Sequence, residues 1–177
     1  MNPALRNKLI AAASGGVLAV AGVLGGWFEG DGPTVKKDGV TYHRVYTDAV
    51  GVRTVCRGIT GRDVVEGKLY TRAECEVLER KHLAIAEAGV KRQINGYDSL
   101  NIWQQAALVD FTYNLGEPAL ASSTMRSLFN AGRTMEACRE LRKWVKGRVQ
   151  GVLVTLRGLV DRREVERELC AEWEAVP

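Results

Sequence analysis

A stretch of twenty residues without a charged side chain, residues 9–28, most constrains what this chain can fold into. Arg6 and Lys8 stand just before it, and Glu29 is the first ionisable residue after it. A helix of about twenty apolar residues is long enough to cross the hydrocarbon core of a membrane. The stretch nevertheless contains five glycines, five alanines and a serine, which offer lipid little apolar area to cover. We therefore expect a segment that can enter a membrane but is held there weakly.

This N-terminal stretch has three interpretations. It is a cleaved signal peptide if residues 19–21 (AVA), which precede Gly22, form an A-x-A cleavage site. It is a retained anchor if its positive end stays in the cytoplasm and the rest of the chain is exported. It is otherwise a buried helix of a soluble protein. The first two interpretations both place the body of the chain outside the cytoplasm.

The remaining sequence has room for one domain of about 150 residues, enough to bury a real core. The chain has 177 residues, and 25 Lys and Arg stand against 21 Asp and Glu, which gives a net charge of +4. This mild basic excess fits an acidic polymer, either nucleic acid or an anionic cell-wall glycan, and it equally fits an ordinary solvated surface. Charge alone does not choose among them.

The cysteines and histidines show no metal-binding spacing. The cysteines are Cys56, Cys75, Cys138 and Cys170, and the histidines are His43 and His82. No C-x-x-C pair occurs, so we expect neither a zinc site nor another metal, and nothing in the sequence indicates a cofactor. An even number of cysteines is compatible with two disulfides in an oxidising compartment, in any of three pairings, or with buried thiols.

The order of the expected elements predicts an α+β fold with an N-terminal helix, a small β-hairpin lobe and a helical lobe. Residues 40–46 and 52–57 are rich in β-branched and aromatic side chains and predict two strands joined by a turn, with room for a third strand near residues 64–65. Thr71 and Glu74 form a capping box at a helix start. Helices are expected over residues 71–90, 100–115, 124–131, 135–145 and 159–173, with a loop at 146–151. A cleft between the lobes is the expected ligand site.

Two carboxyl groups stand where an acid and a base are needed. Glu29 follows Trp27 and Phe28 at the end of the apolar stretch, and a carboxyl beside apolar rings is expected to have a raised pKa and to hold a proton. Asp48 lies in a turn with hydroxyl neighbours, where a carboxylate stays ionised. Two carboxyls with such different environments are an acid/base pair suited to cleaving a glycosidic bond.

Several segments together resemble phage lysozyme-like endolysins, the glycoside hydrolases of family 24. Residues 48–61 (DAVGVRTVCRGITG) resemble the family's D-x-x-G-x-x-T-x-G-x-G segment, and residues 27–30 (WFEG) resemble its apolar-apolar-Glu-Gly at the end of the first helix. The likeness continues in order through residues 67–75 (GKLYTRAEC), 111–116 (FTYNLG), 122–125 (SSTM) and 158–167 (GLVDRREVER). The matching segments cover most of residues 27–173, and we expect a lysozyme-like fold.

The resemblance implies a role for each candidate residue. Glu29 would be the general acid that protonates the glycosidic oxygen, and Asp48 and Thr54 would hold and activate the attacking water. An inverting mechanism of this kind needs carboxyls about 6.5–9.5 Å apart. The implied substrate is the β-1,4 bond between N-acetylmuramic acid and N-acetylglucosamine in peptidoglycan. The implied enzyme is a muramidase that lyses the bacterial host, acts as a monomer, and binds no nucleic acid.

The sequence departs from the family at two places. Residues 30–37 form an extra loop, which leaves Asp38 as a rival for the acid; we prefer Glu29 because Asp38 follows two lysines in a polar loop. Ile59 stands where many members have histidine, which puts an inter-lobe ion pair built on that histidine in doubt.

Other side chains have structural explanations. His82, Trp103 and Phe111 lie on helices and are expected to be structural, and His43 is expected either in its strand or lining the cleft. Arg162 and Glu166 are expected to pair along one helix, and Asn114 to brace the cleft backbone rather than to bind substrate.

If Glu29 is the acid, the N-terminal stretch must also form the helix that positions it. Cleavage after Ala21 would leave under two turns of helix to present Glu29, so retention is favoured over a signal peptide. We therefore divide the chain into a retained signal-anchor helix, residues 1–28, and a catalytic domain, residues 29–177. As in signal-arrest-release endolysins, the segment would hold the enzyme in the inner membrane with its N-terminus in the cytoplasm, and release into the periplasm would let it dock.

Two other classes of function stay open at this stage. One is a non-catalytic, glycan-binding remnant of the same fold. The other is a cationic protein that disrupts membranes through residues 9–28 and its basic surface.

Overall fold

A computed structural model describes residues 1–48 and 51–173 of the chain. The α-helices are α1 (Pro3–Ala12), α2 (Val17–Phe28), α3 (Arg72–Gln93), α4 (Ile102–Leu115), α5 (Glu117–Ala121), α6 (Thr124–Asn130), α7 (Thr134–Glu140) and α8 (Arg157–Glu172). Short 3₁₀ turns are η1 (Ala13–Gly15), η2 (Gly61–Asp63), η3 (Tyr97–Ser99) and η4 (Leu141–Lys143). Strands are β1 (Thr34–Lys37), β2 (Val40–Arg44), β3 (Tyr46–Thr47), β4 (Arg53–Val55), β5 (Ile59–Thr60), β6 (Leu69–Tyr70), β7 (Lys146–Val149) and β8 (Val152–Thr155).

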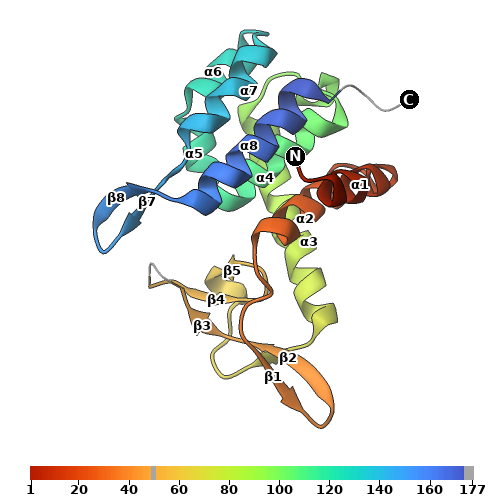
Figure 1. The fold of residues 1–177 in the computed structure, drawn as a ribbon, viewed down its shortest axis with the longest axis vertical. Helices are drawn as coiled ribbons and strands as arrows, with labels where there is room; N and C mark the ends of the chain where they lie inside the picture. Colours follow the sequence, from red (N-terminus) through yellow and green to blue (C-terminus); the bar gives the residue numbers. More distant parts are fainter. Residues whose placement is uncertain (49–50, 174–177) are drawn as a thin grey trace.

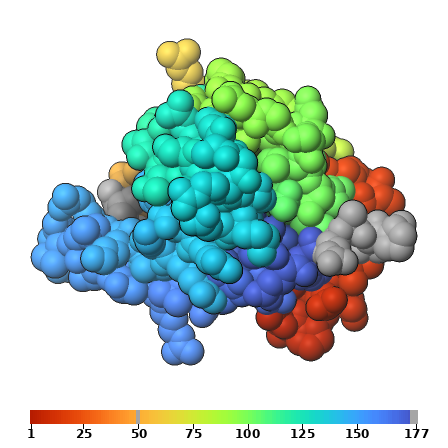
Figure 2. Space-filling model, turned by 90° about the horizontal axis from the view of Figure 1, so that it is seen from above, coloured from red at the N-terminus to blue at the C-terminus, as the bar shows by residue number. Residues whose placement is uncertain are grey.

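The expected α+β, lysozyme-like arrangement of two lobes is confirmed. Strands β1 to β6 form the small lobe, the remaining helices form the large one, and α3 runs from one to the other (Figure 1). Seen from above, the β7–β8 hairpin projects from one side of the large lobe and the N-terminal helices lie on the opposite side (Figure 2). The expected long helices are confirmed at α3, α4 and α8.

Local signals explain where the two central helices begin. The Thr71 hydroxyl accepts the Glu74 backbone N–H while the Glu74 carboxylate accepts the Thr71 N–H, which is the predicted capping box. Asn101 and Gln104 form an equivalent box at the start of α4. Helix α4 is the centre of the large lobe, because eight of its residues, Trp103, Ala106, Ala107, Leu108, Val109, Asp110, Phe111 and Thr112, are buried.

The small lobe contains two three-stranded antiparallel sheets, in the orders β1-β2-β6 and β3-β4-β5. The expected strand at residues 40–46 is divided, and only its end pairs with the next strand: Tyr46 lies opposite Thr54. The strand expected near residues 64–65 is not formed. The strands β5 and β6 lie before and after these residues in the chain. The loop expected at residues 30–37 contains β1, which forms a hairpin with β2.

A second hairpin replaces the loop expected at residues 146–151. Strand β7 pairs with β8, with Lys146 opposite Thr155 and Val149 opposite Val152. The turn uses Gln150 and Gly151, both at positive φ, a conformation that glycine adopts without strain. The two glycines that suggested a loop are therefore parts of a hairpin.

The N-terminal stretch is not one straight helix in this structure. It breaks at Gly16, whose φ of 82° and ψ of −175° are accessible only to glycine, and then resumes as α2. Leu9, Val20 and Leu24 are fully buried in the core that surrounds α4. Among the described helices, none is long and apolar enough to cross a membrane.

Two disulfides fix the pairing that the sequence left open. Cys56 is joined to Cys75, which ties the β4–β5 turn to the start of α3. Cys138 is joined to Cys170, which ties α7 to α8 inside the large lobe.

Candidate active site

Glu29 lies where the two lobes meet, at the C-terminal end of α2. Its backbone N–H donates to Gly25 O at 2.8 Å, which ends the helix, and its side chain is 27% exposed. The carboxylate rests against the backbone of Gly58, where a Cβ would come within 3.3 Å of Glu29 Oε2. Residues from α2 and from the turn between β4 and β5 thus converge on one carboxyl group.

Arg162 holds the other oxygen of Glu29, a contact that the sequence did not predict. Its Nη1 donates to Glu29 Oε1 at 2.5 Å, while its Nε and Nη2 donate to the two oxygens of Asp110 at 2.9 and 2.8 Å. The expected pair with Glu166 is present, at 3.7 Å, but it is the longest of these contacts. Arg162 is 2% exposed, so this is a buried bidentate clamp rather than a surface pair supporting a helix.

The surroundings of Glu29 therefore differ from the apolar ones expected. Trp27 is 39% exposed and lines a cavity between α2 and α3, with Lys8 Nζ 5.4 Å from its ring centroid. Phe28 lies beneath Arg162, whose guanidinium carbon is 5.8 Å from the Phe28 ring centroid. The main neighbour of the Glu29 carboxylate is a cation.

Asp48 and Thr54 lie on the two sides of the turn that joins β3 to β4, as expected. Asp48 N–H donates to Val52 O at 2.9 Å, and Asp48 Oδ1 accepts Val52 N–H at 2.8 Å. The buried Thr54 hydroxyl donates to the same Val52 carbonyl at 3.1 Å. Both side chains are therefore fixed relative to Val52; residues 49 and 50 of the turn lie outside the described part of the chain.

Tyr46 connects these residues to Glu29. It lies opposite Thr54 in the sheet, and burial first, then the charges of Glu29 and Asp48, raises the pKa of its phenol. The Tyr46 ring lies against the segment after Glu29, since a Cβ at Gly32 would lie 3.1 Å from Tyr46 Cε1, and Glu29 itself contacts Gly58 in the turn that follows the strand of Thr54. The sequence predicted Tyr46 at the end of a strand but gave it no role, because its position depends on pairing with β4.

A cavity of about 180 Å³ continues from this region between the lobes. Its lining residues are Gly58, Thr60, His82, Ile85, Ala86, Thr112, Tyr113, Gly116 and Glu117. Gly58 both lines the cavity and contacts Glu29, so the cavity is adjacent to the carboxylate. Thr112 lines the cavity, and its hydroxyl is buried without a hydrogen-bond partner among the described residues.

Ile59 replaces the histidine that many family members have, and other residues form an ion pair between the small lobe and α3. Ile59 is buried in the small-lobe core. His82 Nε2, on α3, lies 2.8 Å from Asp63 Oδ2, and Lys81 Nζ lies 2.8 Å from Asp63 Oδ1. Hydrogen bonds from Lys81 and His82 lower the pKa of Asp63. Asp63 follows β5, so this pair joins the small lobe to α3 without the missing histidine.

The remaining candidates have structural roles. His43 Nδ1 lies 2.8 Å from Asp31 O and braces the segment after Glu29 rather than lining the cleft. Asn114 accepts a hydrogen bond from Arg163 at 3.1 Å, so it braces α8 rather than the cleft backbone. Trp103 and Phe111 are core residues, as expected. Asp38 lies in the turn of the β1–β2 hairpin, away from the end of α2 (Figure 1).

The arrangement is suited to acid–base chemistry on a polar polymer. The Glu29 carboxylate at the end of α2 lies against Gly58 in the turn after Thr54, the side chains of Asp48 and Thr54 are both hydrogen-bonded to Val52, and a cavity adjoins Gly58. Within the described residues, no group of three or more His, Cys, Asp or Glu side chains could hold a metal ion.

Comparison with known proteins identifies the family. The family described as Phage lysozyme matches residues 36–166. The chain is 43% identical to a SAR-endolysin of Bacteriophage PS119 and 41% identical to that of Enterobacteria phage P21, with 96% of this chain covered in both cases, and 96% and 97% of the relatives. Among solved structures, an endolysin from Escherichia coli O157:H7 phage FAHEc1 is 25% identical with a TM-score of 0.70, covering 91% of this chain and 94% of that one. This chain belongs to the phage lysozyme family of endolysins.

Proposed function

We propose that this endolysin is a muramidase that hydrolyses the β-1,4 bond between N-acetylmuramic acid and N-acetylglucosamine in peptidoglycan. The glycan strand would lie between the lobes, along the cavity that adjoins Glu29. Cleavage of host peptidoglycan by such an enzyme lyses the cell and frees the phage.

Each candidate side chain has one task in the proposed reaction. Glu29 donates a proton to the glycosidic oxygen as the bond to the anomeric carbon breaks. Asp48 accepts a proton from a water held between its carboxylate and the Thr54 hydroxyl, and that water attacks the anomeric carbon from the opposite face. The product is an inverted sugar with a free reducing end, and such a mechanism uses carboxyls about 6.5–9.5 Å apart.

The observation that carries the proposal is the contact of the Glu29 carboxylate with Gly58, in the turn that follows the strand of Thr54. Asp48 and Thr54 are both hydrogen-bonded to Val52 in the adjoining turn of the same sheet. This neighbourhood supports a reaction that uses the acid and the water-holding pair together.

The proposal is tested by measuring glycan cleavage with purified peptidoglycan and the full chain. Glu29→Gln is expected to lower kcat by about 100-fold or more, because an amide cannot donate the proton. Asp38→Asn is the matched control, because it removes the carboxylate of the rival candidate for the acid and should leave the rate unchanged. Equal activity of Glu29→Gln and the parent, or loss only in Asp38→Asn, would refute the assignment.

The same assay distinguishes the other classes of function. Hydrolysis adds one water for each bond cleaved, whereas intramolecular cyclisation adds none and leaves one product lighter by one water, so product mass decides between them. Bacterial killing that persists in Glu29→Gln and Asp48→Ala would instead indicate a membrane-disrupting protein.

We further propose that residues 1–28 are retained and serve first as a membrane anchor. Leu5, Leu9, Val20 and Ala21 are buried in the core of the enzyme, so removal of residues 1–21 would expose that core. The structure corresponds to the docked form, in which the stretch is bent at Gly16 and packed on α4. Intact mass of the periplasmic protein tests retention: loss of residues 1–21 would refute it.

A further inference from the structure

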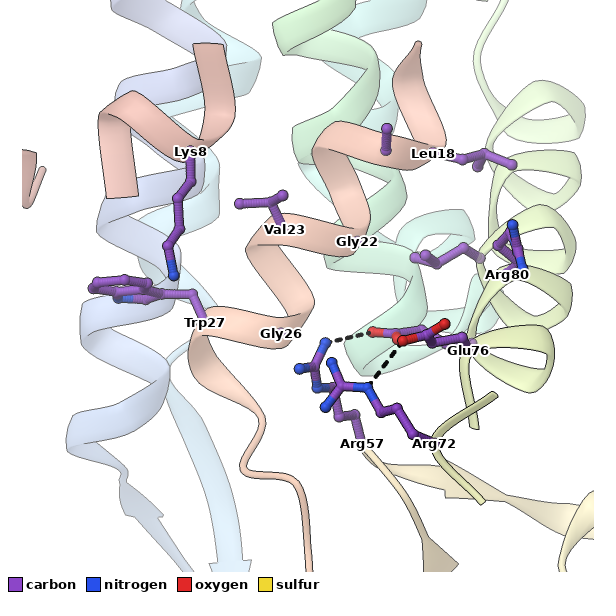
Figure 3. A pocket seen from close by; sticks show the side chains of 13 residues that line it. Lys8, Leu18, Gly22, Val23, Gly26, Trp27, Arg57, Arg72, Glu76 and Arg80 are labelled. Carbon is purple, nitrogen blue, oxygen red and sulfur yellow. Dashed lines mark hydrogen bonds and ion pairs between the residues drawn. The ribbon is translucent and has the colours of Figure 1, made fainter. Parts of the chain in front are cut away.

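Arg57 lies where the segment carrying Glu29, the small lobe and α3 meet. It belongs to the turn between β4 and β5, three positions after Thr54. Its backbone carbonyl accepts the Tyr113 hydroxyl of α4 at 2.8 Å. Its side chain extends toward the end of α2 and the face of α3, into the wall of a cavity of about 440 Å³ (Figure 3).

The guanidinium of Arg57 bridges two carboxylates from different elements. Its Nε donates to Asp31 Oδ1 at 2.8 Å, and its Nη1 lies 3.6 Å from Glu79 Oε1 on α3. Asp31 is two positions after Glu29, and the hydrogen bond from Arg57 lowers the pKa of this carboxyl, so it stays ionised at neutral pH. The side chains of Arg57 and Glu79 are 24% and 15% exposed, so their contact is partly shielded from solvent, whereas Asp31 is 51% exposed.

The same guanidinium rests on the last turn of α2. A Cβ at Gly26 would lie 2.6 Å from Arg57 Nη1, so the cation occupies space that only glycine leaves free. Unpaired carbonyls give the C-terminal end of a helix a partial negative charge, and a cation there is stabilising. Gly26 lies three positions before Glu29, so Arg57 contacts the chain on both sides of the acid.

We propose that Arg57 is a positioning residue that fixes Glu29 relative to Asp48 and Thr54. Its guanidinium contacts Gly26 at the end of α2 and Asp31 in the following segment. Its backbone continues from the strand that contains Thr54. Arg57 thereby sets the separation between the acid and the water site. This inference rests on the proposed function of Glu29, and Arg57 itself contacts neither substrate nor the reacting atoms.

The first test replaces Arg57 by methionine, which keeps the length of the side chain and removes its charge and donors. We expect kcat on soluble peptidoglycan fragments to fall about 10- to 100-fold with less than a twofold change in KM, because misplacing a reacting group by about 1 Å costs up to about 100-fold. Arg80→Met is the matched control, since Arg80 lines the same cavity from α3 and has neither contact. Arg57→Lys should recover part of kcat.

The second test is a double-mutant cycle with Gly26. Gly26→Ala should lower kcat in the parent, because the methyl group displaces the guanidinium, but should cause no further loss in Arg57→Met, where no guanidinium is present. Equal losses from Gly26→Ala in both backgrounds, or an unchanged kcat in Arg57→Met, would overturn the inference. A purely structural role would lower the unfolding midpoint without this dependence.

Failure of this inference is distinguishable from failure of the proposed function. If Glu29→Gln is inactive and Arg57→Met retains the parental kcat, Glu29 is the acid and Arg57 does not position it. If Glu29→Gln retains activity, the proposed function fails before Arg57 is considered.

Discussion

Arg162 shows how a single residue links the candidate site to the core. Burial raises the pKa of Glu166 well above its usual range, although the charge of Arg163 beside it acts in the opposite direction. Burial also acts to raise the pKa of Asp110, but the charge and two hydrogen bonds of Arg162 outweigh it, so the pKa of Asp110 is lowered and Asp110 is ionised. Arg162 is thus shared by one buried and one half-buried carboxylate, Asp110 and Glu29.

Arg162→Met is expected to lower the free energy of unfolding by about 3–5 kcal/mol, because it leaves the Asp110 charge buried without its partner. Urea unfolding at neutral pH measures the change. Arg142→Met provides the comparison: its pair with Glu164 is exposed, and such pairs contribute about 1 kcal/mol or less. Adding Asp110→Asn to Arg162→Met should restore part of the loss. Similar small effects of Arg162→Met and Arg142→Met would contradict this account.

At the scale of single residues, the sequence predicted the positions of those residues whose contacts are close along the chain. Asp48 and Thr54 are joined through Val52 within one turn, so a motif was enough to place them. The clamp on Glu29 joins positions 133 residues apart, and the spacing of Arg162 and Glu166 on one helix suggested only a local pair. Long-range contacts of this kind leave no periodic signal in the sequence.

At the scale of elements, local chemistry decided what could be predicted. The starts of α3 and α4 depend on side chains three positions apart, and residues 71–90 and 100–115 were predicted close to their observed positions. Strands β7 and β8 are almost entirely exposed, so they lack the alternation of buried and exposed residues that identifies a strand. The same is true of β1, whose four residues are all exposed.

The Cys138–Cys170 disulfide is expected to stabilise the large lobe by closing a loop of 32 residues. The loop-entropy relation gives about 3–4 kcal/mol for a loop of that length. Replacing both cysteines by alanine should therefore lower the free energy of unfolding by about that amount in denaturant titrations. A loss below about 1 kcal/mol would show that α7 and α8 hold together without the bond.

At the scale of the whole molecule, the N-terminal segment belongs to the core of the enzyme. Helices α1 and α2 supply buried residues to the cluster around α4, and Arg6 lies 5.0 Å from the centroid of the Trp173 ring beyond the end of α8. The order of apolar segment, small lobe and helical lobe was evident from the residue patterns along the chain. The bend at Gly16 was not, because a run of apolar residues is equally compatible with a straight helix.

Gly16→Ala is expected to favour the proposed membrane-held form. Alanine is strained by about 1–3 kcal/mol in the docked conformation of Gly16 and is favoured over glycine by about 1 kcal/mol in a straight helix. We expect a larger share of the protein to sediment with membranes, and lysis to be delayed. Gly132→Ala introduces strain at another positive-φ glycine, far from the segment, and should leave the distribution unchanged. An unchanged distribution in Gly16→Ala would refute the bend as a determinant.

The glycines of α2 give this segment one further property. A Cβ would lie 2.6 Å from Arg57 Nη1 at Gly26, 3.5 Å from Leu83 Cδ1 at Gly22, and 3.7 Å from Asp110 Oδ1 at Gly25. A larger apolar side chain at Gly26 would strengthen attachment to lipid but would have to displace the Arg57 guanidinium, whereas a methyl group at Gly22 or Gly25 would be in ordinary van der Waals contact. Under the proposed release mechanism, the same segment must be stable both in the bilayer and in the core of the folded enzyme. Packing in the enzyme therefore limits how strongly the segment can bind the bilayer.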